Sequence, residues 1–336
     1  MSNTVEVFAF TVEYFDTNAS LLKQYRLNYF MDTTIEILSA DRTKTILNRI
    51  PYKELNVGML YIGSSVTIFS RQYHIVDYAD NGTRNRYEAL CGKAFGVIKA
   101  SAMGCVGDIL GAIRKNGYVI ADLKTIVGED GEVVCGVLAT SEKHGTVESV
   151  EVFGELMADM TATYGDCYAA ATPEAVKEEA AEFFGEGSYT NSFSGEESSL
   201  CLIKPHIIKE GKLGPIIKAI QEAGFKFACM QMFYLDRECA VEFFDVYRGV
   251  LPRYEEVAKH LIDGPVVALQ IVGDNAVEEF REMCGPTNVE LAKVLRPKTF
   301  RATFGKDIAM NAVHCTDLPE DGQLECKYFF DILAQI

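Results

Sequence analysis

The sequence lacks the apolar segments that mark a membrane or secreted protein. No apolar run in its 336 residues approaches the roughly 18 residues that span a bilayer, so we expect no transmembrane helix and no membrane partner. The N-terminal stretch MSNTVEVFAF has no basic segment followed by an apolar run and a small-residue cleavage site. We therefore expect no secretory signal.

Clustered cysteines are also missing. The ten cysteines are scattered singly, and none forms a CxxC pair. Zinc sites need grouped ligands, so we expect no metal site built from protein side chains. The pattern favours reduced, mostly buried thiols in a cytoplasmic protein.

Basic residues are in short supply. The chain has 32 Lys and Arg against 48 Asp and Glu, a net charge of −16. A nucleic-acid-binding surface needs a basic face, so we expect no nucleic-acid partner. Nucleotide binding needs only a few local cations and stays open. The apolar fraction of 48% and the length are ordinary for a globular protein of two or three domains.

Residues 4–80 predict a succession of short strands. VEVFAFTVEYF alternates in polarity and is rich in β-branched and aromatic residues. YRLNYFMD and TTIEILSA are expected to form a hairpin around the polar stretch MDTT. Many short strands with little helix indicate a small β-barrel or sandwich, which we place at residues 1–88.

After residue 92 a strand–helix–strand pattern occurs twice, about 105 residues apart. The matching residues are Ile98 and Ile203, the inner helix glycines Gly107 and Gly214, and the capping glycines Gly117 and Gly224. A repeat of this length is too long for a solenoid. We interpret it as two copies of one domain, residues 91–187 and 198–336, which can pair with each other within one chain.

Each copy is expected to follow a βαββαβ order. This order predicts an antiparallel sheet with helices on one face, the ferredoxin-like arrangement. The predicted fold class is therefore α+β, with a small β-barrel or sandwich followed by two ferredoxin-like domains. The linker GEGSYTNSFSGEES, residues 185–198, is rich in Gly and Ser and is expected to be exposed.

Five strings in the second copy resemble the nucleoside diphosphate kinases. They are IKP at 203–205, GP at 264–265, CGPTN at 284–288, LRPKTFRATFG at 295–305 and NAVHCTD at 311–317. Five strings in the same order are far more specific than any one of them. The resemblance implies a kinase that moves the γ-phosphate of ATP or GTP to a nucleoside diphosphate, with Mg²⁺ held mainly by the nucleotide phosphates.

His314, in the last string, suits this chemistry. A phosphoryl group in transit can pause on a side-chain nucleophile. A neutral imidazole nitrogen is available near neutral pH. A lone histidine is more often a core or surface residue, but this one lies within the family string. The resemblance implies that His314 is the nucleophile, that Glu325 orients its ring, and that Lys204 is also catalytic.

The phosphates need cations and hydrogen-bond donors, because charge spreads over the transferred oxygens. The resemblance implies nucleotide contacts for Lys204, Phe244, Tyr254, Arg281, Thr287, Arg301, Asn311 and Thr316. The three cations of this set are expected at the phosphates, and Tyr254 is the candidate that stacks on the base. Each of these residues alone is more often a solvated surface group.

The sequence departs from the family at several positions. Cys315 and Thr316 stand where the family usually has Gly and Ser, and His206 replaces an Asp. Phe244 replaces a tyrosine beside the phosphates, which removes one hydroxyl donor. We expect Cys315, which is bulkier than glycine, to restrict the backbone, and we expect lower activity than in single-domain relatives.

The first copy resembles the family less closely. It keeps Lys99, but YAAATPE at 168–174 replaces the string that carries the histidine. The nucleophile position falls at about Ala171, and the stretch contains no histidine. We expect a structural role for this copy and no catalysis.

The whole order, a small β domain followed by two kinase-like copies, resembles the nucleoside diphosphate kinase homologue seven family. The strings YRLNYFMDTTIEI and ELNVGMLYIGSSVTIFSRQYHIVDY carry the N-terminal, DM-ten part of the resemblance. The resemblance implies a cytoplasmic, cytoskeletal protein of ciliary and flagellar axonemes. Its implied partners are nucleotides, tubulin and doublet microtubule proteins, and the gamma-tubulin complex.

Two hypotheses follow from this resemblance. One is an axonemal microtubule-associated protein whose last domain is an active kinase. The other is a purely structural microtubule inner protein with little or no turnover, because a fold need not keep its activity.

Overall fold

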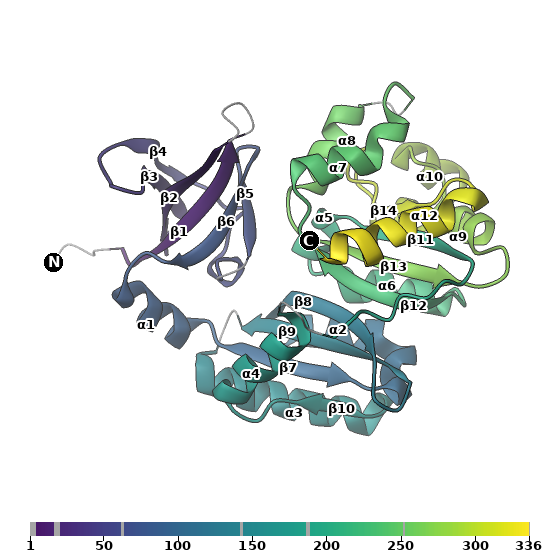
Figure 1. The fold of residues 1–336 in the computed structure, drawn as a ribbon, viewed down its shortest axis with the longest axis horizontal. Helices are drawn as coiled ribbons and strands as arrows, with labels where there is room; N and C mark the ends of the chain where they lie inside the picture. The colour runs from purple at the N-terminus through teal and green to yellow at the C-terminus, as the bar shows by residue number, and fades with distance from the viewer. Residues whose placement is uncertain are drawn as a thin grey trace.

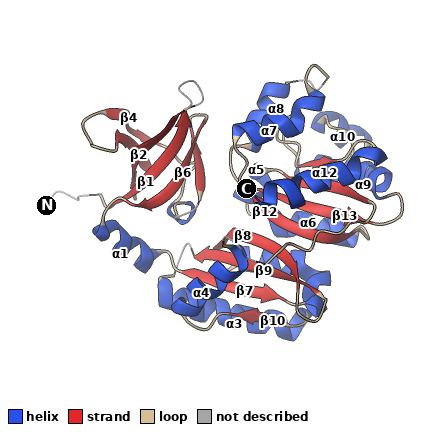
Figure 2. Ribbon diagram, viewed as in Figure 1, coloured by secondary structure: helices blue, strands red, loops and turns tan. Residues whose placement is uncertain are grey.

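The computed structural model describes residues 5–16, 21–61, 64–141, 144–185, 189–250 and 253–335. An N-terminal sheet lies beside two units that each combine strands with helices (Figure 1). Figure 2 shows how little helix the N-terminal unit contains compared with the other two. Within the described ranges, no helix combines the length and apolar character needed to cross a bilayer.

The N-terminal unit is one six-stranded antiparallel sheet. Its strands are β1 (Val7–Asp16), β2 (Leu21–Phe30), β3 (Thr34–Ser39), β4 (Thr45–Pro51), β5 (Ser65–Ile68) and β6 (Arg71–Tyr78). Their order is β4-β3-β2-β1-β6-β5, so β4 and β5 are edges that do not pair in the described part of the chain. The sheet does not close by strand pairing, but it curls: the Tyr52 hydroxyl, directly after β4, donates to the carbonyl oxygen of Thr67 in β5 at 3.0 Å, which is consistent with the small barrel predicted from the sequence. Alternate residues such as Phe8 and Phe10 fill its single core.

The first copy follows the sheet through helix α1 (Asn81–Leu90). Its elements are β7 (Lys93–Ile98), α2 (Val106–Lys115), β8 (Tyr118–Val127), β9 (Val133–Ser141), α3 (Thr146–Tyr164), β10 (Cys167–Ala169) and α4 (Pro173–Phe184). The strand order β10-β7-β9-β8 is that of a ferredoxin-like sheet.

The second copy repeats this plan with additional helices. Its strands are β11 (Ser198–Ile203), β12 (Lys226–Phe233), β13 (Val266–Val272) and β14 (Val313–Cys315), in the order β12-β13-β11-β14. Its helices are α5 (Pro205–Lys209), α6 (Leu213–Glu222), α7 (Arg237–Phe244), α8 (Tyr254–Leu261), α9 (Ala276–Cys284), α10 (Val289–Leu295), α11 (Phe300–Phe304) and α12 (Gly322–Lys327). The ferredoxin-like arrangement predicted for this region is confirmed.

Helices cover both faces of the second copy, not one face as the sequence predicted. Cys201 and Ile203 of β11 face a core that includes α6 and α9. The alternate residues Leu200 and Leu202 face a second core formed with α7, α8 and the C-terminal segment. The second layer exists because both faces of β11 are apolar.

The two copies share one eight-stranded sheet. Strands β8 and β12 pair antiparallel at Lys124 and Gln231, which joins the two ferredoxin-like halves edge to edge. Helices α2 and α6 cross at the matching glycines. A Cβ on Gly107 would lie 2.3 Å from the backbone nitrogen of Lys218, and one on Gly214 would lie 2.3 Å from that of Gly111. The close approach of the helix backbones is the physical reason for these two glycines.

The linker between the copies is partly buried. Residues 186–188 lie outside the described residues. Ser192 is only 6% exposed, and its hydroxyl bonds the Thr125 hydroxyl at 2.8 Å. Asn191 forms a β-bridge with Ile126 of the first copy. The prediction of an exposed linker is therefore wrong for this part, because its polar side chains find partners along β8.

Candidate active site

The imidazole of His314 lies on the edge strand of the shared sheet, facing the aromatic core. His314 pairs with Leu202 across β14 and β11 and is 6% exposed. Its ring centroid lies 5.2, 5.5 and 6.0 Å from those of Phe243, Phe244 and Tyr247. The strand and the aromatic rings fix the imidazole in position.

A carboxylate determines which ring nitrogen of His314 is free. Nε2 lies 3.0 Å from Oε2 of Glu325. A carboxylate only accepts hydrogen bonds, so Nε2 carries the proton and Nδ1 keeps its lone pair. The arrangement leaves one nitrogen available for attack on phosphorus.

Thr316 holds that carboxylate in place. Its hydroxyl donates to the same oxygen of Glu325 at 2.8 Å and accepts from the backbone nitrogen of Leu200 at 2.9 Å. The side chain is fully buried and is not among the residues that line the cavity beside His314. The structure corrects the nucleotide contact predicted for Thr316, which instead positions Glu325 from behind the histidine.

Two buried cations lie beside the histidine. Lys204 is 2% exposed, and its Nζ donates to the carbonyl oxygen of Ala309 at 2.9 Å. Burial, and then the charge of Arg301, lower the pKa of Lys204 to about 7. Arg301 donates to the carbonyl oxygens of Gly285 at 2.6 Å and Val313 at 3.2 Å. Both cations are costly to bury without an anion, so they favour a phosphate group.

A cavity of about 40 Å³ opens between these groups. Its lining residues are Lys204, Phe244, Tyr247, Val257, Thr287, Arg301, Ile308, Asn311, Val313, His314, Cys315 and Asp317. The volume suits roughly three water molecules, so about one phosphate group fits inside and the rest of a nucleotide must lie toward the mouth. Asn311 presents a buried Oδ1 with no partner among the described residues, an acceptor for a ligand hydroxyl.

The structure places Arg281 and Tyr254 away from the cavity lining. The exposed Arg281 pairs with Asp317 at 3.2 Å, which puts it at the rim. Tyr254 is 9% exposed and packs in the aromatic core as the first residue of α8. Val257, one turn further along α8, lines the cavity instead. The base-stacking prediction for Tyr254 is corrected, because its ring faces the core.

Tyr247 lines the cavity and was not predicted from the sequence. It lies in the 3₁₀ turn Asp245–Tyr247 that follows α7, three residues after Phe244. Its hydroxyl bonds Asp317, and burial raises the pKa of Tyr247. The hydroxyl lost at Phe244 is thus replaced one turn later. A tyrosine three residues after Phe244 was the signal available in the sequence.

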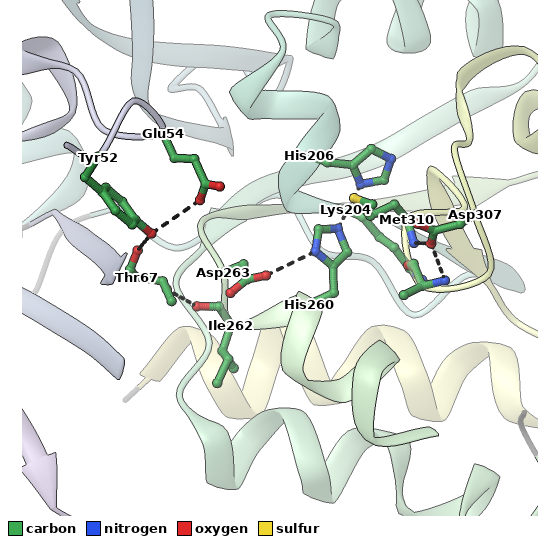
Figure 3. Close-up of polar contacts among 11 residues, drawn as sticks. Tyr52, Glu54, Thr67, Lys204, His206, His260, Ile262, Asp263, Asp307 and Met310 are labelled. Atoms are coloured by element: carbon green, nitrogen blue, oxygen red, sulfur yellow. Dashed lines mark hydrogen bonds and ion pairs between the residues drawn. The ribbon is translucent and has the colours of Figure 1, made fainter. Parts of the chain in front are cut away.

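A line of contacts connects the cavity to the N-terminal sheet (Figure 3). His206, two residues after Lys204, bonds His260 of α8 through Nδ1 and Nε2 at 2.8 Å. Burial, His260 and Lys204 lower the pKa of His206 to about 3, so the ring is neutral. The Thr67 hydroxyl of the N-terminal sheet donates to the carbonyl oxygen of Ile262 at 2.8 Å. The helix that walls the cavity is therefore held from both sides.

The first copy has a tyrosine at the position of the histidine. Tyr168 pairs with Val97 as His314 pairs with Leu202. The sequence predicted Ala171 at this position, and the sheet register shows that it lies three residues earlier. The Tyr168 hydroxyl donates at 2.7 Å to Glu179, which follows it by eleven residues as Glu325 follows His314.

The first copy also lacks the walls of a nucleotide cleft. A short turn joins β8 to β9, whereas α7 and α8 stand between β12 and β13. Lys99, which matches the buried Lys204, is exposed. Burial raises the pKa of Tyr168 to about 12, with the Glu179 carboxylate adding to the effect, so its phenolate is scarce near neutral pH. These features oppose nucleophilic chemistry in this copy.

The ferredoxin-like fold, the buried histidine–carboxylate pair and the two cations define the nucleoside diphosphate kinase class. The family model "Nucleoside diphosphate kinase" matches residues 197–333. The nucleoside diphosphate kinase of Aquifex aeolicus is 37% identical over 40% of this chain and 94% of its own length.

More specific relatives match nearly the whole chain. "Nucleoside diphosphate kinase homolog 7" of Rattus norvegicus is 35% identical, and that of Mus musculus is 36% identical. Each match covers 98% of this chain and 94% of the relative. The chain belongs to the nucleoside diphosphate kinase homolog 7 family.

Proposed function

We propose that the C-terminal unit transfers the γ-phosphate of a nucleoside triphosphate to a nucleoside diphosphate through phospho-His314. The observation that carries this proposal is the Nε2 contact with Glu325, which leaves Nδ1 free. Nδ1 attacks the γ-phosphorus, a P–N bond forms, and the bridging P–O bond breaks with its electron pair leaving on the diphosphate. An oxygen of a second diphosphate then attacks the phosphohistidine, and the P–N bond breaks.

The surrounding residues support both half-reactions. Lys204 and Arg301 offset the charge that spreads over the transferred oxygens. Asn311 accepts a hydrogen bond from a sugar hydroxyl, and Thr287 donates to the phosphates. We propose Mg²⁺ as the divalent ion, carried by the phosphates of ATP or GTP. Hard cations prefer oxygen ligands, and Asp317 is the carboxylate in the cavity lining that can contribute one.

The test is formation of a phosphoenzyme from γ-labelled ATP. The wild type is expected to take up acid-labile label and to pass it to added GDP. His314→Ala is expected to take up none, while His144→Ala, which changes a histidine of the first copy, labels like the wild type. A folded, ATP-binding wild type that stays unlabelled would refute the kinase proposal.

We further propose that the protein works in the cytoplasm on ciliary and flagellar axonemes, as part of the cytoskeleton. Two features support this role. The N-terminal sheet, proposed to be a DM-ten domain, contributes none of its described residues to the cavity lining, and the first copy has a tyrosine in place of the nucleophile. Tubulin, doublet microtubule proteins and the gamma-tubulin complex are the proposed partners. The competing proposal is a structural microtubule inner protein without turnover.

Binding to microtubules separates these proposals from a free enzyme. Sedimentation with doublet microtubules, and with plain microtubules as a control, is expected to recover both the wild type and His314→Ala. Release of both proteins into the supernatant would refute the cytoskeletal role. If cilia assemble normally with His314→Ala but not without the protein, the structural proposal is favoured over the catalytic one.

A further inference from the structure

Three thiols gather on the opposite side of β14 from the His314 ring. Cys315 on β14 lies directly opposite Cys201 on β11, and Cys284 ends helix α9. All three are at most 1% exposed and belong to the same core. The Cys284 thiol interacts with the Cys315 thiol, so these two sulfur atoms are neighbours in the core.

Cys315 differs from ordinary buried thiols because it reaches the nucleotide cavity. Cys315 is among the residues that line the cavity, next to His314 in the chain. Its sulfur accepts from Nη2 of Arg301 at 3.6 Å. The same guanidinium donates to the carbonyl oxygen of Gly285, the residue after Cys284, at 2.6 Å. Arg301 therefore holds the two cysteine-bearing segments together.

These surroundings give the two thiols different reactivity. The hydrogen bond from Cys284, followed by the charges of Arg301 and His314, lowers the pKa of Cys315 below its ordinary value against the opposing effect of burial. Burial raises the pKa of Cys284 well above its ordinary value. These opposite shifts favour the thiolate, which is the nucleophilic form, at Cys315 and the protonated thiol at Cys284.

We infer that Cys315 and Cys284 are a peroxide-sensitive dithiol whose oxidation inactivates the phosphate site. The Cys315 thiolate attacks hydrogen peroxide, the O–O bond breaks, hydroxide leaves, and a sulfenic acid forms. The Cys284 sulfur then attacks this sulfur, the S–O bond breaks, and the oxygen leaves as water with the Cys284 proton. The two sulfur atoms lose two electrons, which the peroxide accepts.

The disulfide would act on the kinase site through Arg301 and β14. Its formation removes the thiolate that accepts from Arg301 and draws the end of α9 toward the residue that follows His314. Both changes move groups that line the cavity. The effect on activity rests on the proposed kinase function, whereas the disulfide itself does not.

The experiment treats the full-length reduced protein with rising amounts of hydrogen peroxide. Peptide mapping without reductant is expected to show a Cys284–Cys315 linkage, and phosphoenzyme formation is expected to fall in parallel. Dithiothreitol should restore both free thiols and labelling. Peptide mapping detects the disulfide without any kinase activity. A wild type that forms no phosphoenzyme would therefore refute the kinase proposal but leave the disulfide proposal intact.

Two variants make the assignment specific. Reduced Cys284→Ala is expected to form the phosphoenzyme like the wild type. After peroxide treatment it is expected to accumulate a sulfenic acid at Cys315, which dimedone traps. Cys284→Ser replaces this variant if it does not fold. Cys239→Ala, a half-buried thiol on α7, is expected to form the linkage like the wild type. A Cys201–Cys315 linkage, or an unmodified Cys315 in protein whose other thiols are oxidised, would overturn the inference.

Discussion

At the scale of single residues, the site depends on which polar atoms already have partners. Nε2 of His314 is occupied by Glu325, and Glu325 is in turn held by Thr316. Nδ1 is left for the phosphorus, and the buried Oδ1 of Asn311 has no partner among the described residues, so it can accept from a ligand. Phosphorylation at Nδ1 makes the ring cationic, so the carboxylate stabilises the intermediate more than the free histidine.

Replacing Glu325 by glutamine tests that stabilisation. Glu325→Gln keeps the shape and an oxygen near Nε2 but removes the charge. Hydrogen bonds to charged groups contribute about 1.5–3 kcal/mol, so phosphohistidine formation is expected to slow by about 10- to 150-fold. Rapid-quench labelling with γ-labelled ATP measures the rate. Glu320→Gln, an exposed glutamate nearby, is the control, and equal rates in the two variants would contradict the role of Glu325.

The lowered pKa of Lys204 predicts a pH dependence of nucleotide binding. In the free protein Lys204 loses its proton as the pH rises through about 7. Bound phosphates favour the charged form, so binding above pH 7 is expected to take up close to one proton and to weaken by up to about tenfold per pH unit. Titration calorimetry in buffers of different ionisation enthalpy measures the uptake. Lys204→Arg carries a fixed charge, and an unchanged uptake in this variant would exclude Lys204 as its source.

The sequence predicted the site residues that lie in the family strings better than the residues whose positions depend on strand register. His314, Lys204 and Arg301 lie in family strings, and the structure brings all three to one cavity. Tyr168 and Tyr247 could not be placed in this way, since their positions depend on strand pairing and on the turn after α7. The direction in which a side chain points could also not be predicted from the sequence: Tyr254, expected to stack on the base, packs in the core.

At the scale of elements, the two copies differ in what stands between their second and third strands. Helices α7 and α8 wall the cavity of the second copy, and a short turn replaces them in the first. The helices that remain similar, α2 and α6, form the contact between the copies. The sequence repeat and the capping glycines predicted this plan, and Gly117 and Gly224 have φ values of 86° and 90° as expected for caps.

The α2–α6 contact predicts opposite effects for two glycine substitutions. Gly214→Ala places a Cβ 2.3 Å from the Gly111 backbone, and such overpacking is expected to lower the free energy of unfolding by about 1–3 kcal/mol. Gly111→Ala meets no atom within 4 Å, so it is expected to raise that free energy by about 0.5–1 kcal/mol. Urea denaturation distinguishes them. Equal destabilisation by both would mean that the backbones do not approach this closely.

At the scale of the whole molecule, the N-terminal sheet is anchored to both copies by one tyrosine. The Tyr61 hydroxyl donates to the carbonyl oxygen of Ala121 in the first copy and accepts from the Tyr234 hydroxyl of the second, each at 2.8 Å. Thr67 adds the contact to Ile262 at the end of α8. The sequence predicted three units, but side-chain contacts between distant segments left no periodic signal that could reveal how the units dock.

Removing one hydroxyl tests this docking. Tyr61→Phe leaves the Ala121 carbonyl and the Tyr234 hydroxyl without their partner in a buried contact. An unpaired buried polar group costs about 1–3 kcal/mol, enough to favour separation of the sheet from the kinase-like units. Small-angle X-ray scattering is expected to show a larger radius of gyration, and limited proteolysis faster cleavage around α1. Tyr25→Phe removes the same hydroxyl from a tyrosine packed on Tyr73 inside the sheet and should leave both measurements unchanged. A compact Tyr61→Phe variant with wild-type proteolysis would show that the apolar contacts alone hold the sheet in place.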